Sequence, residues 1–174
     1  MENKMKNILI SEQEIKDKIK TLGAVISKDY EGKKLYVLSL LRGSFIFTAD
    51  LVRCIEVPTK IGFMTTSSYG NNEDSTGTVK LLYDVPDNIE GYDVLIVDDI
   101  VDTGITMNFI KDHVEKLGAN SVKCCSLLDK PDRRTVEIAP DYCCFQIPDL
   151  FVVGYGLNYG DYYRNIPYIF NFKE

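Results

Sequence analysis

Short apolar runs recur along the chain, and they predict the strands of its fold. The run at residues 93–97, Asp-Val-Leu-Ile-Val, contains three β-branched side chains and ends abruptly at Asp98 and Asp99. A run of this kind is typical of a strand that is buried on both faces of a parallel sheet. Further runs with the length of strands lie at residues 35–41, 59–67, 79–85, 123–128, 142–147 and 150–155.

Amphipathic segments separate these runs and predict helices. Ser11 and Glu14 form a capping box at the start of the first helix. Ser44 is expected to cap a second helix that ends near Cys54, and Gly118 is expected to stop a third. Because helices and strands alternate, we expect an α/β fold with a largely parallel, twisted sheet flanked by helices. The apolar positions with helical spacing are Ile15, Ile19, Leu22 and Ile26 in the first helix and Met107, Ile110, Val114 and Leu117 in the third.

Composition limits the choice of architecture and of partners. The chain has 174 residues, of which 45% are hydrophobic, enough for one well-filled core and hence a single domain over residues 1–174. Its net charge of −6 argues against general binding to nucleic acid or to anionic membranes. No apolar run approaches the ~20 residues of a membrane span. We therefore expect a cytoplasmic protein with neither nucleic acid nor membrane as a partner.

The cysteines and the single histidine give no indication of a metal site. The chain has five cysteines, an odd number, and its N-terminal apolar stretch is too short for a signal peptide, which favours reduced thiols. No C-x-x-C spacing occurs. We interpret the pairs Cys124–Cys125 and Cys143–Cys144 as strand cysteines, with one member of each pair facing the core. His113 is interpreted as a helix residue without a partner.

The chemistry of the chain is concentrated directly after the strand at residues 93–97. Asp102, Thr103, Gly104 and Thr106 follow the acidic pair at a strand-to-helix junction. Free backbone N–H groups and the helix dipole favour an anion there, so this turn predicts a site for one phosphate group. Two adjacent carboxylates beside a phosphate make sense if they accept hydrogen bonds from sugar hydroxyls or approach Mg²⁺. A ribose 5-phosphate satisfies both requirements.

These residues also resemble a known family. Residues 95–106, Leu-Ile-Val-Asp-Asp-Ile-Val-Asp-Thr-Gly-Ile-Thr, resemble the phosphoribosyl-pyrophosphate (PRPP) motif of the type I phosphoribosyltransferases, and the likeness extends from about residue 8 to residue 170. Leu41-Arg42-Gly43 is similar to that family's pyrophosphate loop. Residues 67–70 are similar to the start of its flexible lid, here at about residues 69–78. Lys130 and residues 151–156 resemble its purine pocket, and residues 162–165 its closing segment.

The resemblance implies an enzyme of purine salvage on the type I phosphoribosyltransferase fold, with a small hood formed by the chain ends. Such an enzyme transfers the 5-phosphoribosyl group from PRPP to a 6-oxopurine, hypoxanthine or guanine, and releases IMP or GMP with pyrophosphate. The resemblance implies that Asp102 is the general base. It also implies that Asp98 and Asp99 bind the ribose hydroxyls and act as ligands of Mg²⁺. The other implied contacts to substrate are Thr103, Gly104, Ile105 and Thr106 for the 5-phosphate, Arg42, Gly43 and Arg164 for pyrophosphate, Ser68 and Tyr69 for the lid, and Lys130, Phe151, Val152 and Asn158 for the purine. The family also suggests a cis peptide at Leu41–Arg42 and a homodimer or homotetramer.

Two positions depart from the family, and other functions stay open. Asn158 stands where the family usually has Asp, which predicts weaker binding of a metal ion, and Arg42 stands where it often has Lys. A transferase that prefers xanthine or adenine is one alternative, although the ammonium of Lys130 has only donors and so matches a 6-oxo group better than a 6-amino group. A non-catalytic regulator that binds PRPP or a nucleotide on the same fold is another.

Overall fold

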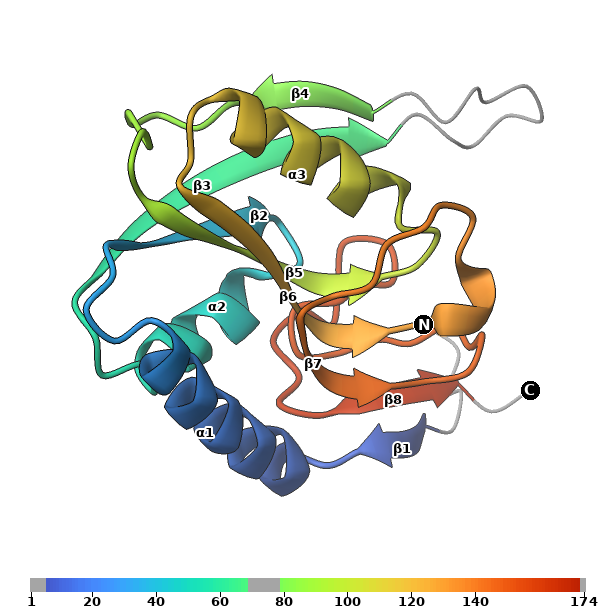
Figure 1. Cartoon of the computed structure of the whole chain (residues 1–174). Coiled ribbons are helices and arrows are strands. Elements are labelled where there is room, and N and C mark those ends of the chain that lie inside the picture. Colours follow the sequence, from blue (N-terminus) through green and yellow to red (C-terminus); the bar gives the residue numbers. More distant parts are fainter. Residues whose placement is uncertain (1–5, 69–78, 173–174) are drawn as a thin grey trace.

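The computed structural model describes residues 6–68 and 79–172, and it has a largely parallel sheet at its centre (Figure 1). The sheet has six strands in the order β4-β3-β2-β5-β6-β7. All neighbouring strands are parallel except β4, which pairs antiparallel with β3. The predicted fold class is therefore confirmed. The elements of the sheet and its helices are β2 (Leu35–Leu41), α2 (Phe45–Val52), β3 (Thr59–Ser68), β4 (Val79–Tyr83), β5 (Asp93–Val101), α3 (Ile105–Lys116), β6 (Ser121–Asp129) and β7 (Tyr142–Gln146), with α1 (Glu12–Asp29) before them and the 3-10 turn η1 (Pro131–Arg133) between β6 and β7.

The start of α1 follows directly from its sequence. Ser11 is the N-cap, its hydroxyl accepts from the N–H of Glu14, and the Glu14 carboxylate accepts from the N–H of Ser11 at 2.8 Å, which is the predicted capping box. The predicted apolar face is buried along the whole helix, from Ile15 to Ile26. Capping and burial on one face together fix where α1 begins and which side meets the sheet.

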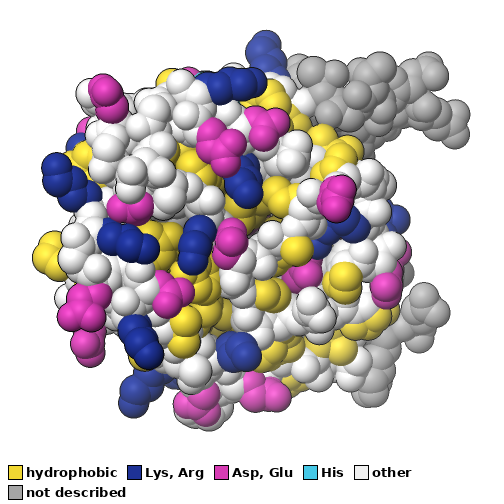
Figure 2. Space-filling view, in the orientation of Figure 1, with side chains coloured by type: hydrophobic (Ala, Val, Ile, Leu, Met, Phe, Trp, Pro, Cys, Tyr) yellow, Lys and Arg dark blue, Asp and Glu magenta, His cyan; other side chains and the backbone are white. Residues whose placement is uncertain are grey.

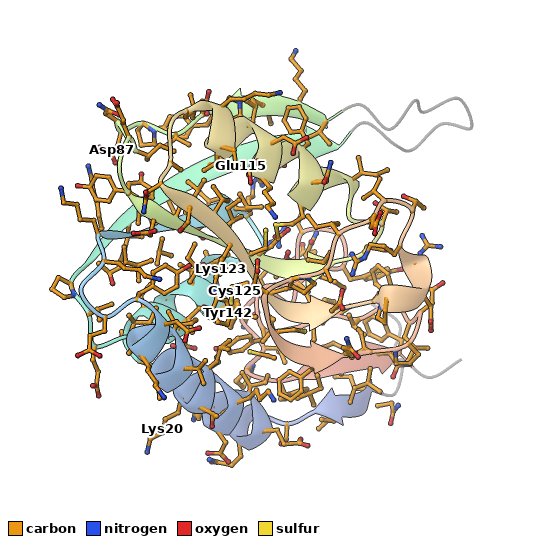
Figure 3. All side chains as sticks on the ribbon, in the orientation of Figure 1. Lys20, Asp87, Glu115, Lys123, Cys125 and Tyr142 are labelled. Carbon is orange, nitrogen blue, oxygen red and sulfur yellow. The ribbon has the colours of Figure 1, made fainter. Side chains whose placement is uncertain are left out.

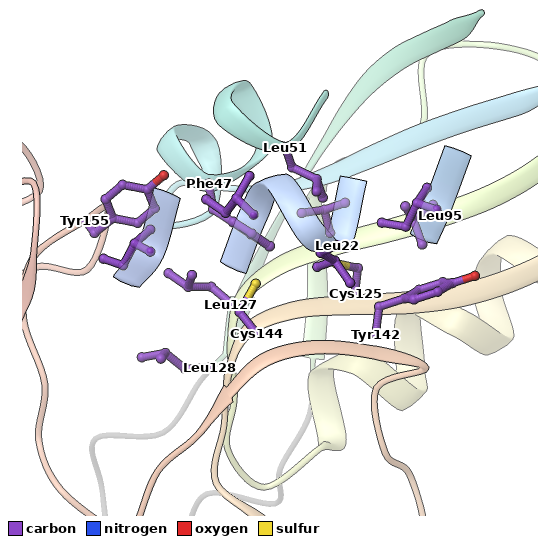
Figure 4. Packing of buried hydrophobic residues seen from close by; sticks show 14 of the residues in the cluster. Leu22, Phe47, Leu51, Leu95, Cys125, Leu127, Leu128, Tyr142, Cys144 and Tyr155 are labelled. Carbon is purple, nitrogen blue, oxygen red and sulfur yellow. The ribbon is translucent and has the colours of Figure 1, made fainter. Parts of the chain in front are cut away.

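Helices cover both faces of the sheet, which gives two apolar cores. The first core lies between the sheet and helices α1 and α2, where Leu22, Phe47 and Leu51 pack on side chains of β5 and β6 (Figure 4). The second lies under α3, with Met107, Ile110 and Val114 buried against the opposite face. Burial of a large aliphatic or aromatic side chain contributes roughly 1.5–3 kcal/mol, so these two layers account for most of the stabilisation of the fold.

A small hood is built from segments at the two ends of the chain. Strand β1 (Lys6–Ile10) pairs antiparallel with β8 (Ile169–Phe172), and the two lie side by side below the main sheet in Figure 1. Val153 forms a bridge with Phe170, which ties the hood to the segment after β7. The hood that the family resemblance implies is therefore present.

Some predicted boundaries are wrong. The strand expected to end at residue 97 continues as β5 to Val101, because β6 continues beside it and pairs with it as far as Asp129. Residues 150–155 do not form a strand: the backbone turns at Gly154, whose φ is +102°, and only isolated bridges remain, between Val153 and Phe170 and between Gly154 and Leu157. Strand β4 ends at Tyr83, two residues before the predicted end.

Four side-chain predictions also need correction. Cys124 and Cys125 are both buried, because helices cover both faces of the sheet at β6, whereas Cys143 and Cys144 behave as expected. Figure 3 labels Cys125 on β6 together with Lys123 of the same strand and Tyr142 of β7, and Tyr142 is the partner of Cys125 in the sheet register. Ser44 takes the N-cap position of α2, but its hydroxyl bonds to the carbonyl of Leu40. His113 has a partner, since its Nε2 lies 2.8 Å from a carboxylate oxygen of Asp84, and Leu117 is exposed.

The surface carries both signs of charge. Lysines and arginines are interspersed with aspartates and glutamates across the face shown in Figure 2. Within the described part of the chain, no helix is long and apolar enough to span a membrane.

Candidate active site

The acidic pair lies at the carboxyl end of β5. The Asp98 carboxylate accepts from the N–H of Asp99 at 2.9 Å, and the Asp99 carboxylate accepts from the N–H of Ile100 at 3.0 Å. Burial raises the pKa of Asp98 well above its ordinary range, and the neighbouring charge of Asp99 adds to this effect. Burial also raises the pKa of Asp99, although hydrogen bonds and the positive charge of Arg164 oppose that shift. Ionisation of both carboxylates therefore requires a nearby cation or several hydrogen-bond donors to stabilise the two negative charges.

The predicted phosphate turn joins β5 to α3. Gly104 is the N-cap of α3 with φ of +84°, and a Cβ at this position would lie 2.6 Å from Ile138 and 2.8 Å from Arg134, so only glycine fits. The Thr103 hydroxyl accepts from the N–H of Ile105 at 3.4 Å. A cavity of about 120 Å³ opens here, several times the share of liquid volume that one water takes. Its lining residues are Asp98, Ile100, Val101, Asp102, Thr103, Gly104, Thr106 and Met107.

The predicted pyrophosphate turn lies against the acidic pair. The peptide between Leu41 and Arg42 is cis, as the family resemblance suggests. Gly43 follows, and a Cβ on it would lie 1.6 Å from an oxygen of Asp99, so the turn and the end of β5 are in direct contact. The parallel pairing of β2 with β5 brings these two strand ends together.

Three hydroxyl side chains stabilise the pyrophosphate turn. Ser39 lies 2.8 Å from both Ser44 and Thr48, and Ser44 donates to the carbonyl of Leu40 at 2.6 Å. All three hydroxyl side chains are buried, so this network fixes the backbone just before and just after the turn.

Lys130 stands at the carboxyl end of β6, beside the phosphate turn. Its backbone N–H donates to the carbonyl of Val101 at 2.9 Å. Its side chain is only 9% exposed, and the ammonium lies 3.6 Å from Asp149. A nearly buried lysine of this kind offers hydrogen-bond donors to a polar group in the site.

Two arginines that the sequence reasoning did not single out contact Asp102. Arg133 Nε donates to the Asp102 carboxylate at 3.0 Å, and this hydrogen bond raises the pKa of Arg133. Arg134 donates to the Asp102 backbone carbonyl at 3.0 Å and pairs with the buried carboxylate of Asp129. Both arginines lie within four residues of Lys130 in the sequence. This short separation from a predicted site residue could have identified them as further candidates. The contact with Asp102 could not be seen in the sequence, because it depends on the pairing of β5 with β6.

The remaining predicted residues follow β7. Phe151 is 62% exposed, and its ring meets Tyr159 edge to face at 5.9 Å, so much of the ring is accessible for stacking on a planar ligand among the residues that the structure describes. The side chain of Val152 is buried in the first core, so a contact with a ligand there would come from its backbone. The exposed Asn158 donates through its amide to the carbonyl of Gly160. Arg164 donates to the carbonyl of Gly156 at 2.6 Å.

One predicted segment is not in view. Ser68 is the last residue of β3, and Tyr69 and the rest of the lid expected at about 69–78 lie outside the described residues. The structure otherwise brings the predicted residues to one edge of the sheet, at the carboxyl ends of β2, β5 and β6 and in the segment after β7.

Comparison with known proteins agrees with this arrangement. The family model of the phosphoribosyl transferase domain matches residues 6–160. The chain belongs to this family. The match contains the phosphate turn, the pyrophosphate turn, Lys130 and Asn158.

Within the phosphoribosyltransferases, the chain is similar to proteins named for hypoxanthine and guanine. A hypoxanthine-guanine phosphoribosyltransferase of Lactococcus lactis subsp. lactis is 48% identical over 169 residues, which is 97% of this chain and 92% of that protein. The structure of a hypoxanthine phosphoribosyltransferase from Staphylococcus aureus has a TM-score of 0.94 at 43% identity and covers 98% of this chain and 93% of its own. A hypoxanthine-guanine phosphoribosyltransferase from Bacillus anthracis has a TM-score of 0.91 at 46% identity, covering 95% of this chain and 98% of its own.

Proposed function

We propose that this phosphoribosyltransferase acts in purine salvage and transfers the 5-phosphoribosyl group of PRPP to hypoxanthine or guanine. The products are IMP or GMP and pyrophosphate. The observation that carries the proposal is that the nearly buried Lys130 lies beside Asp102 and the phosphate turn. One ligand can therefore contact a hydrogen-bond donor for its purine, a general base and a phosphate site at the same time.

The ribose 5-phosphate is placed in the turn between β5 and α3. The first backbone N–H groups of α3, with the hydroxyls of Thr103 and Thr106, supply donors to the phosphate oxygens. The carboxylates of Asp98 and Asp99 then accept hydrogen bonds from the ribose hydroxyls, which replaces some of the interactions that burial removes.

The pyrophosphate is placed between the turn of Arg42 and Gly43 and the segment that carries Arg164. The contact of Gly43 with Asp99 puts this turn next to the ribose. The absence of a Cβ lets backbone N–H groups approach the leaving group closely. Arg42 and Arg164 supply the positive charge that a departing pyrophosphate requires.

The purine is placed between Lys130 and Phe151. The Lys130 ammonium donates to the 6-oxo group, the exposed face of Phe151 stacks on the ring, and the backbone near Val152 meets the ring edge. A 6-amino group would face the ammonium with a second donor, so adenine is expected to be a poor substrate.

The chemical step is a substitution at C1 of the ribose. A nitrogen of the purine forms the new bond to C1, the bond from C1 to the pyrophosphate oxygen breaks, and the electron pair leaves with pyrophosphate. Asp102 accepts the proton that the purine imidazole loses. Residues 69–78, proposed as the lid, would exclude water from the oxocarbenium-like centre.

Mg²⁺ fits the donor set at the end of β5. Two carboxylates are typical of protein sites for this ion when substrate oxygens complete the coordination. The described residues hold no group of three or more His, Cys, Asp and Glu side chains that could by themselves hold a metal ion. Asp98 and Asp99 would hold the ion, and when bound it neutralises charge on pyrophosphate.

We also propose that the protein is a homodimer or homotetramer. Ile61 and Phe63 lie on one face of β3 and are 42% and 45% exposed. Phe63 is in register with Ser39, whose hydroxyl bonds to that of Ser44, the residue before the exposed Phe45. Light scattering after size exclusion tests this proposal: the native protein should exceed the monomer mass, and Phe63→Glu should reduce it.

A substrate panel tests the proposed reaction. The protein is incubated with PRPP, Mg²⁺ and each of hypoxanthine, guanine, xanthine and adenine, and the nucleotide formed is measured. Product with hypoxanthine and guanine is expected. The relatives described above give no support to the regulator or to the preference for xanthine. PRPP binding by calorimetry without product from any base would favour the regulator, and product mainly from xanthine would favour the other transferase.

A further inference from the structure

Arg133 connects the two side chains that are proposed to contact polar atoms of the purine, Asp102 at the imidazole and Lys130 at the 6-oxo group. Its Nε donates to Oδ1 of Asp102 at 3.0 Å. One of its terminal nitrogens lies 3.6 Å from Oδ2 of Asp149. The other oxygen of Asp149 lies 3.6 Å from the Lys130 ammonium. The four side chains therefore form one chain of alternating charge that begins at Asp102 and ends at Lys130.

The backbone around Asp102 is held by other groups. Arg134 donates to the backbone carbonyl of Asp102, and it is anchored by the buried carboxylate of Asp129. The N–H of Lys130 donates to Val101, and the N–H of Thr135 donates to the carbonyl of Thr103 at 3.0 Å. The fold of this turn therefore does not depend on Arg133, whose hydrogen bond acts on the Asp102 side chain alone.

We propose that Arg133 is a positioning residue for the carboxylate of Asp102. The inference rests on the proposed function, because it assumes that Asp102 accepts the proton of the purine. Arg133 holds Oδ1, while Oδ2 has no hydrogen-bond partner among residues 6–68 and 79–172 and is left to receive that proton. Because the guanidinium is planar and its donors have fixed directions, one hydrogen bond also sets the rotation of the carboxylate.

The link through Asp149 has a second effect. The imidazole and the 6-oxo group of a purine are joined by a rigid ring, so their separation cannot adjust to the enzyme. Arg133 and Asp149 tie the position of the Lys130 ammonium to that of the Asp102 carboxylate. The two proposed purine contacts are thereby linked to each other through side chains as well as through the backbone.

A purely structural ion pair would behave differently. The side chains of Arg133 and Asp102 are 48% and 40% exposed, and ion pairs this exposed contribute little to stability. Removal of Arg133 should thus leave unfolding nearly unchanged. An effect on turnover without an effect on unfolding is the mark of positioning.

The test uses Arg133→Gln and Arg133→Lys in the full chain, with Arg53→Gln as a matched control. Arg53 is also an exposed arginine paired with an aspartate, but it lies after α2 on the face of the first core. We expect Arg133→Gln to lower kcat with hypoxanthine by about 10- to 100-fold, in line with the effect of a misplaced catalytic group, and to leave KM for PRPP unchanged. Arg133→Lys should recover part of the loss, because it restores the charge but not the planar geometry. The control should match the native enzyme.

A double-mutant cycle with Asp102→Asn completes the test. If Arg133 acts through Asp102, Arg133→Gln has little further effect once Asp102 is replaced. A native kcat in Arg133→Gln, or an equal loss in both backgrounds, overturns the positioning role while leaving the proposed function intact. A native kcat in Asp102→Asn alone overturns the role of Asp102 and, with it, this inference.

Discussion

Gly156 lies directly on the pyrophosphate turn, against the carbonyl oxygen of Gly43. A Cβ on Gly156 would lie 2.1 Å from that oxygen, and the φ of Gly156 is +101°. Arg164 donates to the carbonyl of the same glycine. Two segments that are proposed to bind pyrophosphate from opposite sides therefore meet at a single pair of glycines.

The first prediction concerns this contact. Gly156→Ala should raise KM for PRPP strongly, because the added methyl group must displace the turn of Gly43. Gly32→Ala is the control, since Gly32 also has a positive φ, +73°, but open space around its Cβ position. That variant should lose about 1–2 kcal/mol of stability in urea unfolding with a normal KM. An unchanged KM for PRPP in Gly156→Ala would show that the two segments can separate without cost to binding.

The second prediction concerns the general base. Asp102→Asn should fold and bind PRPP normally, but nucleotide formation should slow by roughly 10²–10⁴-fold, the usual contribution of such a group. Steady-state rates with hypoxanthine give the effect, and calorimetry with PRPP serves as the control. Near-native turnover across the pH range would remove Asp102 from this role.

The third prediction concerns recognition of the purine. Lys130→Ala should weaken the use of 6-oxopurines far more than PRPP binding, by the ~1–3 kcal/mol that an unpaired buried acceptor costs. The fold-change in kcat/KM for hypoxanthine, set against the fold-change in Kd for PRPP, separates the two effects. Lys20→Ala, on the outer surface of α1 (Figure 3), should change neither quantity. Efficient use of adenine by the native enzyme would contradict the assignment of Lys130.

The fourth prediction concerns the departure from the family at residue 158. Asn158→Asp should lower the Mg²⁺ concentration needed for half-maximal rate, because hard cations prefer anionic oxygen to an amide. The replacement also removes the hydrogen bond to Gly160, so Asn158→Ala is needed as a control that loses the bond without adding charge. Overlapping Mg²⁺ titrations of the native enzyme and Asn158→Asp would show that this position does not tune the metal.

The sequence carries most of the fold because its strongest patterns are local. The strand at residues 35–41 and the capping box of α1 are set by neighbouring residues, and both are confirmed. The end of β5 is not local: Asp98 to Val101 stay in the sheet because β6 pairs with them, although two aspartates there suggest a loop. Residues 150–155 mislead in the opposite sense, since their apolar side chains fill the first core without pairing as a strand.

The residues of the candidate site also differ in whether a local sequence pattern could predict them. Asp98, Asp99 and the phosphate turn form one continuous motif, so the sequence could place them together. Arg133 is about thirty residues further along the chain, and nothing near it in the sequence points to Asp102. Its contact exists only because β5 and β6 end side by side, which a local pattern cannot reveal.

The pairing of β1 with β8 has a consequence for the order of folding. Asn7 and Asn171 bond across this pair although they are separated by 164 residues, and closing so long a loop is costly in entropy and slow. The bridge between Val153 and Phe170 then brackets the stretch that contains Asn158 and Arg164. During refolding, the sheet and its helices should thus form before the closing side of the site takes its place. Circular dichroism should recover first, and the ability to turn over PRPP should return later, with the hood.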